Sequence, residues 1–427
     1  MIGSVIWDVA VVGAGPAGAS AARAAAESGA RVLLLEKAQL PRYKTCGGGL
    51  IGLSLAALPP GFDVPVRQRI DAISFSHQGR RAKTRRDRSG GLLTLVNRAE
   101  FDQALAKAAV EAGARLCEGA AVTGIEQPGN TTDRGSEDGS EDGAEVSHTG
   151  DDRSAQDATD APAPSGRTDA GLVVLTLSDG SQVSARAVIG ADGSASRVAR
   201  HVGVAFRQVD LGLEAEIPVP PAVAAQWSGR VLIDWGPVRG SYGWVFPKGD
   251  TLTVGVIAAR GEGEATRAYY REFIERLGLA EYPAVTDSGH LTRCRAAGSP
   301  LSRGRVLVAG DAAGLLEPWT REGISYALRS GRLAGEAAAR LAAAPDAQSV
   351  AAAAEAYREQ VEDALGAEMA AGERLLAGFE KRPGFFHAAV TTLPLAWRAF
   401  AEVCRGRTTF AALLRSRAAQ AALRAIS

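Results

Sequence analysis

The segment Gly13-Ala-Gly-Pro-Ala-Gly18 constrains the fold more than any other part of the sequence. The apolar run Trp7–Val12 precedes it, and the alanine-rich stretch Ala19–Ser28 follows it. In a strand–turn–helix unit, the first glycine permits a tight turn, the second lets the backbone approach a pyrophosphate, and the third lets helix and strand pack closely. The aliphatic run Arg31–Glu36 then ends in a carboxylate that can bind ribose hydroxyls. The pattern predicts a Rossmann-type unit that binds an adenine dinucleotide.

This glycine motif alone does not distinguish NAD from FAD, and three later segments bear on the choice. Val306–Gly314 is typical of a strand that ends in Gly310-Asp311, where the carboxylate can accept hydrogen bonds from ribose or ribityl hydroxyls. Asp192 ends another apolar strand, and Arg98 opens a helix from which its guanidinium can reach cofactor phosphates. Each residue alone is equally well explained as a turn aspartate or a surface arginine. Their order along one chain favours a single extended cofactor.

Composition and charge limit the classes of protein to which the chain can belong. Its 427 residues are 46% hydrophobic and 22% charged, which suits roughly two or three globular units. The formal net charge is +0, so no global field attracts nucleic acid. The cysteines are widely separated and form no pair or cluster with histidine, which predicts neither a metal site nor a disulfide framework, and favours a reducing, cytoplasmic location. They are Cys46, Cys117, Cys294 and Cys404.

The pattern along the chain predicts an α/β (α+β overall) architecture with three parts. A discontinuous Rossmann-type domain covers residues 1–205 and 290–345, and residues 206–289 form an antiparallel β substrate domain. Residues 346–427 form a C-terminal helical region that becomes increasingly basic. Residues 128–170 are rich in small and acidic residues, which predicts a disordered insertion at a hairpin tip.

A glycine-rich loop and an aromatic stripe are the remaining candidates for chemistry. In Cys46-Gly-Gly-Gly49 the glycines allow backbone to lie close to a flat ligand. Cys46 is open to three interpretations: a pocket wall, a thiol that tunes a bound ring, or a small buried hydrophobe. Tyr242, Trp244 and Phe246 alternate, so they share one sheet face, either as core or as the apolar roof of a pocket. His290 lies in no recognisable pattern and is assigned a structural or surface role.

Several of these motifs together resemble the flavoprotein hydroxylase superfamily and, within it, the geranylgeranyl reductase family. The matching segments are Arg42–Gly49, Tyr242–Lys248 and Glu322–Ala327 with the preceding Pro318. Two positions depart from the family pattern. The proline that usually precedes the tyrosine by three residues is absent, the nearest being Pro237. Arg321 also stands where the family usually has glycine before Glu-Gly-Ile.

The resemblance implies an FAD-dependent oxidoreductase that reduces carbon–carbon double bonds of an isoprenoid (geranylgeranyl or polyprenyl) chain by hydride transfer. The alternative is an FAD-dependent monooxygenase, hydroxylase or halogenase-like, acting on an apolar small molecule; a flavin-stabilised lipid-binding protein without activity is a third interpretation. The external reductant is left open among NAD(P)H, a ferredoxin and a quinol. Expected partners are a hydrophobic substrate and an electron-donor protein. The basic C-terminal region either lies on the inner face of a membrane, caps a lipid tunnel, or is a solvated arginine face on helices packed against the main body.

The motifs and the resemblance together predict two sets of site residues. The catalytic and substrate residues are Cys46, Tyr242, Trp244, Phe246 and Pro247. The FAD-binding residues are Gly13, Gly15, Pro16, Ala17, Gly18, Glu36, Lys37, Cys46, Gly47, Gly48, Gly49, Arg98, Val122, Asp192, Gly310, Asp311, Gly323 and Ile324.

Overall fold

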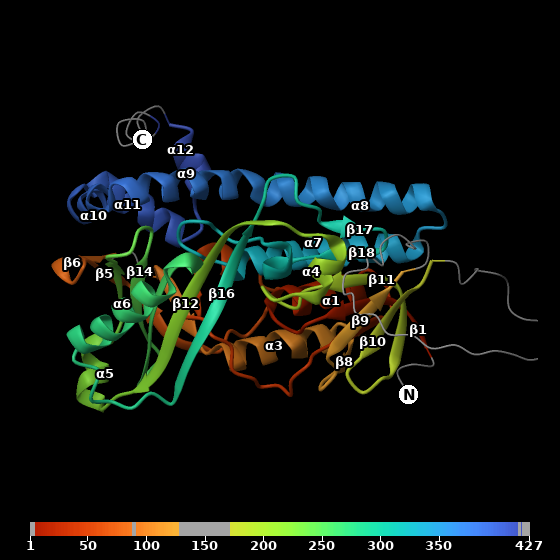
Figure 1. Ribbon diagram of the computed structural model, residues 1–427, viewed down its shortest axis with the longest axis horizontal. Helices are drawn as coiled ribbons and strands as arrows, with labels where there is room; N and C mark the ends of the chain where they lie inside the picture. Colours follow the sequence, from red (N-terminus) through yellow and green to blue (C-terminus); the bar gives the residue numbers. More distant parts are fainter. Residues whose placement is uncertain (1–4, 88–90, 128–170, 417–419, 421–427) are drawn as a thin grey trace, which may run out of the picture.

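The structure is a computed structural model that describes residues 5–87, 91–127, 171–416 and 420. The predicted insertion, 128–170, lies outside the described residues. Figure 1 shows an elongated molecule with one sheet at each end. Helices α7 (Ile324–Ala343), α8 (Ala347–Val361) and α9 (Ala367–Lys381) run along one side, the last two joined by a π-helical turn at Glu362–Gly366. None of the helices in the described part of the chain has the length and apolar character that crossing a bilayer requires.

The first sheet has a parallel centre, as predicted for a Rossmann-type unit. Its central order is β17 (Ser302–Arg303), β18 (Val306–Val308), β11 (Gln182–Gly190), β1 (Ile6–Val12), β2 (Val32–Leu35) and β8 (Arg115–Cys117), and β10 (Val173–Leu177) joins β11 to β9 (Val122–Glu126). Strand β2 is buried along its whole length, because helices cover both faces of such a sheet. Helix α1 (Pro16–Glu27) packs closely on α7, where a Cβ atom added at Gly331 would lie 2.2 Å from the Ala17 carbonyl oxygen.

The second sheet has seven strands and forms the opposite end of the molecule (Figure 1). Its order is β16 (Thr286–Arg295), β12 (Phe206–Pro218), β15 (Thr251–Ala259), β14 (Tyr242–Pro247), β13 (Arg230–Trp235), β5 (Ala72–His77) and β6 (Arg80–Arg86). One face packs on α5 (Pro221–Trp227) and α6 (Gly263–Arg276), through buried side chains such as Tyr269 and Phe273. The other face is free of these helices and borders a cavity.

The extent of this sheet differs from the predicted substrate domain at 206–289. Strands β5 and β6 come from the N-terminal part of the chain, and β5 pairs with β13 in parallel, so the sheet is mixed. Strand β16 also continues to Arg295. The local pattern of β5 contains nothing that says which sheet it joins, so the sequence did not reveal that it pairs with β13. The domain bounds themselves stay a prediction.

The remaining elements connect and close the two sheets. A small sheet consists of β3 (Gly49–Leu50), β7 (Leu93–Val96) and β4 (Val66–Ile70), and the short helices are α2 (Gly52–Ala56), α3 (Arg98–Glu111) and α4 (Arg197–Val202). At the C-terminal end, α10 (Pro383–Thr392), α11 (Pro394–Cys404) and α12 (Phe410–Leu414) pack with α9 against the second sheet. Their contact with the sheet is aromatic: the ring centroids of Trp235 and Phe379 lie 5.0 Å apart, and those of Phe75 and Phe400 lie 5.7 Å apart. The α/β fold class is confirmed.

Candidate active site

One cavity of about 1000 Å³ lies between the two sheets and extends beneath the C-terminal helices. The glycine turn lines one end, the Cys46–Gly49 loop lines its middle, and Phe400 and Phe410 line the far end. This volume is at the upper end of the roughly 300–1,000 Å³ range of small-molecule sites. The cavity therefore joins a polar region at the first sheet to an apolar region at the second.

The glycine turn has the geometry that a pyrophosphate requires. Gly13 has a φ of +98°, and a Cβ atom there would lie 2.5 Å from the carbonyl oxygen of Ala191. A Cβ atom at Gly18 would lie 1.7 Å from the Gly13 carbonyl oxygen. At Gly15 the nearest atom would be 3.7 Å away, at the Arg42 guanidinium. Gly13 and Gly18 are thus needed for the turn itself, whereas Gly15 keeps open the space at the N-terminus of α1, where backbone N–H groups favour an anion.

A buried network of charges lies beside this turn. Glu36 is 3% exposed, and its carboxylate accepts a hydrogen bond from the Ala14 N–H at 2.8 Å. Arg42 bridges Glu36 and Asp102, with N–O distances of 3.4 and 3.0 Å. Arg98 binds Asp102 through two hydrogen bonds of 2.9 and 3.0 Å, and this carboxylate raises the pKa of Arg98 against the opposing effect of burial. The network fits FAD, because it places a carboxylate and two fixed guanidinium groups around the phosphate cradle.

The Cys46–Gly49 loop lies against the aromatic stripe. A Cβ atom at Gly47 would meet the Phe246 ring at 2.8 Å and Trp244 Nε1 at 3.3 Å. Gly48 has a φ of +71°, and a Cβ atom there would lie 2.2 Å from the Val96 carbonyl oxygen. Substitution of either glycine would therefore displace the loop or its neighbours. Cys46 is half-buried, and its thiol sulfur accepts the Gly48 N–H at 3.4 Å, so it lies in the cavity wall.

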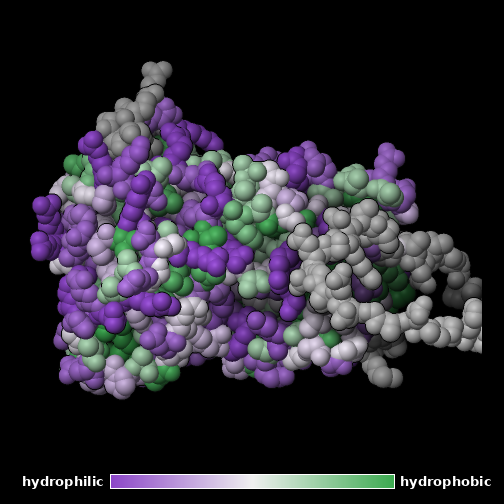
Figure 2. Space-filling model, in the orientation of Figure 1, coloured by the Kyte–Doolittle hydropathy of each residue, from purple (hydrophilic) through white to green (hydrophobic). Residues whose placement is uncertain are grey.

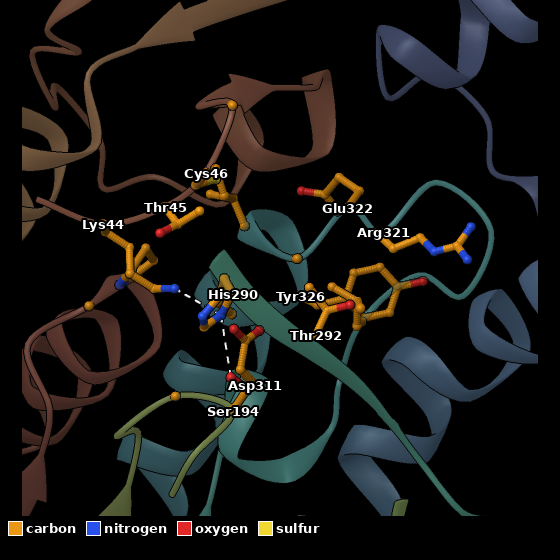
Figure 3. Close-up of a pocket in the computed structure, with 18 of the residues that line it drawn as sticks. Lys44, Thr45, Cys46, Ser194, His290, Thr292, Asp311, Arg321, Glu322 and Tyr326 are labelled. Atoms are coloured by element: carbon orange, nitrogen blue, oxygen red, sulfur yellow. Dashed lines mark hydrogen bonds between the residues drawn. The ribbon is translucent and has the colours of Figure 1, made fainter. Parts of the chain in front are cut away.

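Opposite this loop lies a polar cluster that the sequence did not reveal (Figure 3). Lys44 Nζ lies 2.9 Å from His290 Nε2, and Ser194 Oγ lies 3.3 Å from the same nitrogen. Burial and the Lys44 charge lower the pKa of His290 to about 4, so the ring is neutral and accepts a hydrogen bond from the Lys44 ammonium group. Asp311 lies beside this pair in Figure 3. His290 is therefore a cavity residue, which corrects the structural or surface role assigned from sequence; no local pattern marks it, because its partners come from distant segments.

The cavity face of the second sheet has a polar half and an apolar half. Strand pairing places one row of residues side by side across the sheet. Paired residues share a face, and in order they are Ser288, Glu214, Gly255, Trp244, Ile233 and Phe75. A Cβ atom at Gly255 would lie 2.2 Å from the Trp244 ring, so the indole lies over this glycine and extends toward Glu214. Trp244 thus marks the border between the two halves.

Glu214 is the central group of the polar half. The residue is fully buried, and its Oε1 accepts hydrogen bonds from the Cys46 N–H at 2.8 Å and the Tyr43 hydroxyl at 3.2 Å. Its Oε2 has no hydrogen-bond partner among the described residues. Burial raises the pKa of Glu214 to about 7, and Lys248 opposes this shift. Glu214 is therefore a cavity carboxyl group that can hold a proton near neutral pH on an oxygen without a protein partner.

The apolar half forms a chamber between the sheet and the C-terminal helices. Its floor consists of side chains from β5 and β13, including Phe75, Ile233 and Trp235. Its roof comes from α11 and α12, including Phe400 and Phe410. Side chains of this kind exclude water and offer an extended apolar ligand contact along the length of the chamber.

Arg321 and Tyr242 close the chamber toward the middle of the cavity. Arg321 is buried, has a φ of +56°, and forms an ion pair with Asp210 at 3.1 Å. Its guanidinium carbon lies 5.8 Å from the centre of the Tyr242 ring. The Tyr242 hydroxyl donates a 2.5 Å hydrogen bond to the Thr320 carbonyl oxygen. Glycine, which the family resemblance leads one to expect at this position, would adopt such a positive φ without strain.

Most of the residues predicted from sequence line this cavity. They are Gly13, Gly15, Pro16, Ala17, Glu36, Lys37, Cys46, Gly47, Gly48, Gly49, Arg98, Val122, Asp192, Asp311, Gly323, Ile324, Tyr242, Trp244 and Phe246. Asp192 also accepts hydrogen bonds from Ser196 and the Arg197 N–H, so its carboxylate caps α4.

Three predicted residues lie outside the cavity lining. Gly18 and Gly310 lie behind it: a Cβ atom at Gly310 would meet that of Ala17 at 2.7 Å. Pro247 is wrongly predicted to bind substrate, because successive side chains of β14 alternate and its own is buried on the face opposite Phe246.

Comparison with known proteins agrees with this geometry. A family model described as FAD dependent oxidoreductase matches residues 8–137, and one described as FAD binding domain matches residues 167–364. Digeranylgeranylglycerophospholipid reductase of Methanocella arvoryzae is 30% identical over 380 residues, 84% of this chain and 84% of the relative. Menaquinone reductase of Mycobacterium tuberculosis H37Rv is 29% identical over 348 residues, 77% of this chain and 76% of the relative.

The fold is also that of a solved relative. The crystal structure of a geranylgeranyl bacteriochlorophyll reductase-like protein from Thermoplasma acidophilum has a TM-score of 0.68 at 20% identity, and the match covers 93% of this chain and 96% of that one. The chain therefore belongs to the geranylgeranyl reductase family of FAD-dependent oxidoreductases.

Proposed function

We propose that the protein saturates carbon–carbon double bonds in an isoprenoid chain, using reduced FAD. The observation that carries this proposal is the continuity of the cavity from the glycine turn, past the Cys46–Gly49 loop, to the aromatic chamber. A chain bound in the chamber has its nearest double bond at the border marked by Trp244. Relatives named for reduction of digeranylgeranylglycerophospholipid and of menaquinone, both of which contain prenyl chains, support the same substrate class.

The residues of the chamber bind and orient the chain. Phe75, Ile233 and Trp235 contact it from the sheet, and Phe400 and Phe410 contact it from the helices. Each buried methylene of a ligand contributes up to about 0.8 kcal/mol before ordering costs are subtracted. Dry walls also keep water away from the reacting carbons. The chamber therefore favours long, apolar ligands, and its apolar walls do not require the ligand to carry a particular polar group.

When bound, reduced FAD supplies the hydride for this chemistry, and its two electrons come from an external donor of the nicotinamide, ferredoxin or quinol class. An isolated alkene is a poor hydride acceptor, so saturation also needs a proton at the second carbon. Glu214 holds that proton at Oε2, the oxygen without a protein partner. Donation leaves a buried carboxylate, which Lys248 stabilises.

A hydrogen-bonded route for the replacement proton leads from Glu214 to the surface. The Tyr43 hydroxyl contacts both the Glu214 carboxylate and Ser288 Oγ at 3.2 and 3.1 Å, and Tyr43 is 44% exposed. Burial raises the pKa of Tyr43 to about 12, so the phenol stays neutral and passes a proton without ionising. Tyr43 thus returns the proton to Oε1, and rotation of the carboxyl group then presents it again on the side without a protein partner.

Anaerobic single-turnover measurement tests this function. Photoreduced protein is mixed with a polyprenyl alcohol of four isoprene units, and flavin reoxidation and the saturated product are followed together. We expect one saturated bond for each flavin reoxidised. Flavin that is stable to the polyprenyl compound but yields a hydroxylated phenol when oxygen is admitted would instead establish the monooxygenase.

A further inference from the structure

An exposed basic strand forms one edge of the second sheet. Strand β6 has the sequence Arg-Arg-Ala-Lys-Thr-Arg-Arg, and six of its seven residues are exposed. Cations on an edge strand discourage pairing with other chains, and that role alone would explain some of them. The protein has a net charge of +0, so this strand is a local concentration of positive charge.

Exposed apolar side chains lie on α10 and at its junction with α11. Leu393, between the two helices, and Leu395, near the start of α11, are 53% and 81% exposed, and Phe385, in the first turn of α10, is 42% exposed. Three of the eight exposed large hydrophobic side chains in the described residues thus lie within the segment 385–395. Protection of a sheet edge does not account for these exposed hydrophobic side chains. Burial of the same side chains within the protein would have been favourable, so their exposure points to an interaction site.

The basic strand and the apolar junction form one surface, here called the α10–β6 face. Arg85 Nη1 donates to the Thr391 carbonyl oxygen at 3.4 Å, and His387 Nε2 lies 3.1 Å from the Arg81 carbonyl oxygen. The Arg85 guanidinium also lies 5.4 Å from the centre of the Trp397 ring. Figure 1 shows β6, α10 and α11 together at the end of the molecule opposite the N-terminus, and in Figure 2 hydrophilic side chains crowd that end.

We propose that the α10–β6 face docks on an anionic phospholipid bilayer, with Leu393, Leu395 and Phe385 inserted at the interface and the β6 cations against lipid phosphates. Apolar side chains surrounded by Lys and Arg are the pattern by which proteins lie on, without crossing, such a membrane. An acidic protein partner would match the charge, but it offers no apolar layer for three protruding hydrophobic side chains. The bilayer is therefore the occupant that accounts for both halves of the face.

The biological use of membrane docking rests on the function proposed above, because docking would bring the protein to a lipid-borne isoprenoid substrate. Helix α11 presents Leu395 to the outside, while Phe400 and Val403 of the same helix line the chamber. Docking would therefore place the chamber wall directly behind the membrane contact. An isoprenoid chain attached to a membrane lipid would then need to move out of the bilayer only by the thickness of helix α11 to enter the chamber.

Vesicle co-sedimentation of the FAD-loaded protein tests the docking. Vesicles contain either phosphatidylcholine alone or an equal mixture with phosphatidylglycerol. We expect sedimentation with the anionic vesicles, at least tenfold weaker binding to the neutral ones, and loss of binding in high salt. The variants Leu393→Ser/Leu395→Ser and Arg80→Gln/Lys83→Gln should each weaken binding at least fivefold. Absence of binding to the anionic vesicles would overturn the proposal.

Matched controls remove the same kinds of side chain elsewhere. Val285→Ser removes a 71% exposed hydrophobic residue, and Lys107→Gln/Arg115→Gln removes two exposed cations from the first half of the chain. Both should bind vesicles as the wild type does. If the charge variant loses binding and the leucine variant does not, the face recognises an acidic surface without insertion, and the bilayer proposal is wrong.

The docking and the proposed reaction can fail independently. Turnover of a detergent-solubilised prenyl substrate should be the same in Leu393→Ser/Leu395→Ser as in the wild type, and melting temperature with flavin absorbance checks that both are folded. Binding to vesicles without reduction of the prenyl substrate would support the docking surface and reject the proposed function. Reduction of the prenyl substrate without binding to vesicles would support the proposed function and reject the docking surface.

Discussion

The Arg321 guanidinium donates to the Asp210 carboxylate at 3.1 Å, and each side chain is only 4% exposed. Arg321 also donates to the Trp319 carbonyl oxygen at 2.6 Å. Its backbone has a φ of +56°, a conformation that costs a residue with a side chain about 1–3 kcal/mol. The buried ion pair therefore holds a strained residue in the wall between the Cys46–Gly49 loop and the chamber.

The variant Arg321→Gly should relax the backbone but leave the Asp210 charge buried. Loss of one partner of a buried pair costs about 3–5 kcal/mol, which exceeds the strain that glycine relieves. We expect a net loss of about 2–3 kcal/mol in the free energy of unfolding, measured by urea denaturation of the FAD-loaded protein.

The double variant Arg321→Gly/Asp210→Asn is the control for this prediction. It removes the charge together with its partner, so most of the lost stability should return. A double variant no more stable than the single one would show that the arginine acts by packing and not by charge.

At the glycine turn, Gly15→Val should abolish FAD binding without unfolding the protein. A Cβ atom at this position meets no protein atom closer than 3.7 Å, so the side chain would occupy the space that the pyrophosphate needs. The measurement is the flavin-to-protein ratio after purification, with circular dichroism to check folding. Gly261→Val is the control, because that glycine has nothing within 4 Å and lies far from the cavity lining. Stoichiometric FAD in Gly15→Val would show that the cofactor lies elsewhere.

Glu214→Gln should lower turnover by about 10²–10⁴-fold, the usual contribution of a general acid, while FAD stays bound. The amide keeps an oxygen for the Cys46 N–H and loses the transferable proton. In the wild type, turnover should decline as pH rises through about 7, because only the protonated acid donates. That decline should be absent from the residual activity of the variant. If turnover by the wild type does not change with pH across this range, Glu214 is not the proton donor.

Stability gives a second, independent readout of the same proton. Burial raises the folded-state pKa of Glu214 from 4.5 to about 7, so its favourable contribution is complete below pH 4.5 and is lost as pH rises through 7. The melting temperature of the wild type should therefore fall relative to that of Glu214→Gln over this interval. A parallel course of the two curves would mean that the carboxyl is ionised throughout.

Glu322 is one rival proton donor; Glu317, another buried cavity carboxyl with a raised pKa, likewise has one oxygen without a hydrogen-bond partner among the described residues. Burial raises the pKa of the Glu322 carboxyl too, and it lines the cavity, but its oxygens are already occupied by the Ser325 N–H and hydroxyl at 2.8 and 2.6 Å. Glu322→Gln should therefore disturb the start of α7 and reduce turnover far less than Glu214→Gln. The reverse order of the two effects would assign the proton to Glu322.

The sequence predicted those parts of the site that are formed by contiguous residues, and it did not predict those formed by residues far apart along the chain. The Gly13–Gly18 turn, the Cys46–Gly49 loop and the Trp244 stripe are contiguous motifs whose spacing fixes their geometry. Glu214 and His290 are single polar residues in strands, and only the pairing of β12 with β16 and the fold of the Lys44 segment bring them to the cavity. Their partners are 168 and 246 residues away along the chain.

Trp244 gives the most direct test of the isoprenoid proposal. Its indole lies over Gly255 at the border between Glu214 and the apolar chamber, where the proposed function places the double bond that reacts. Trp244→Ala should lower turnover of long chains while FAD stays bound, because the residue is remote from the glycine turn. In the wild type, affinity should rise with each added isoprene unit until the chamber is full, by up to about 0.8 kcal/mol for each buried methylene before ordering costs. The measurement is a binding and turnover series from one to four isoprene units on both proteins. A series without length dependence, together with activity on a small phenol and consumption of oxygen, would replace the reductase by the monooxygenase.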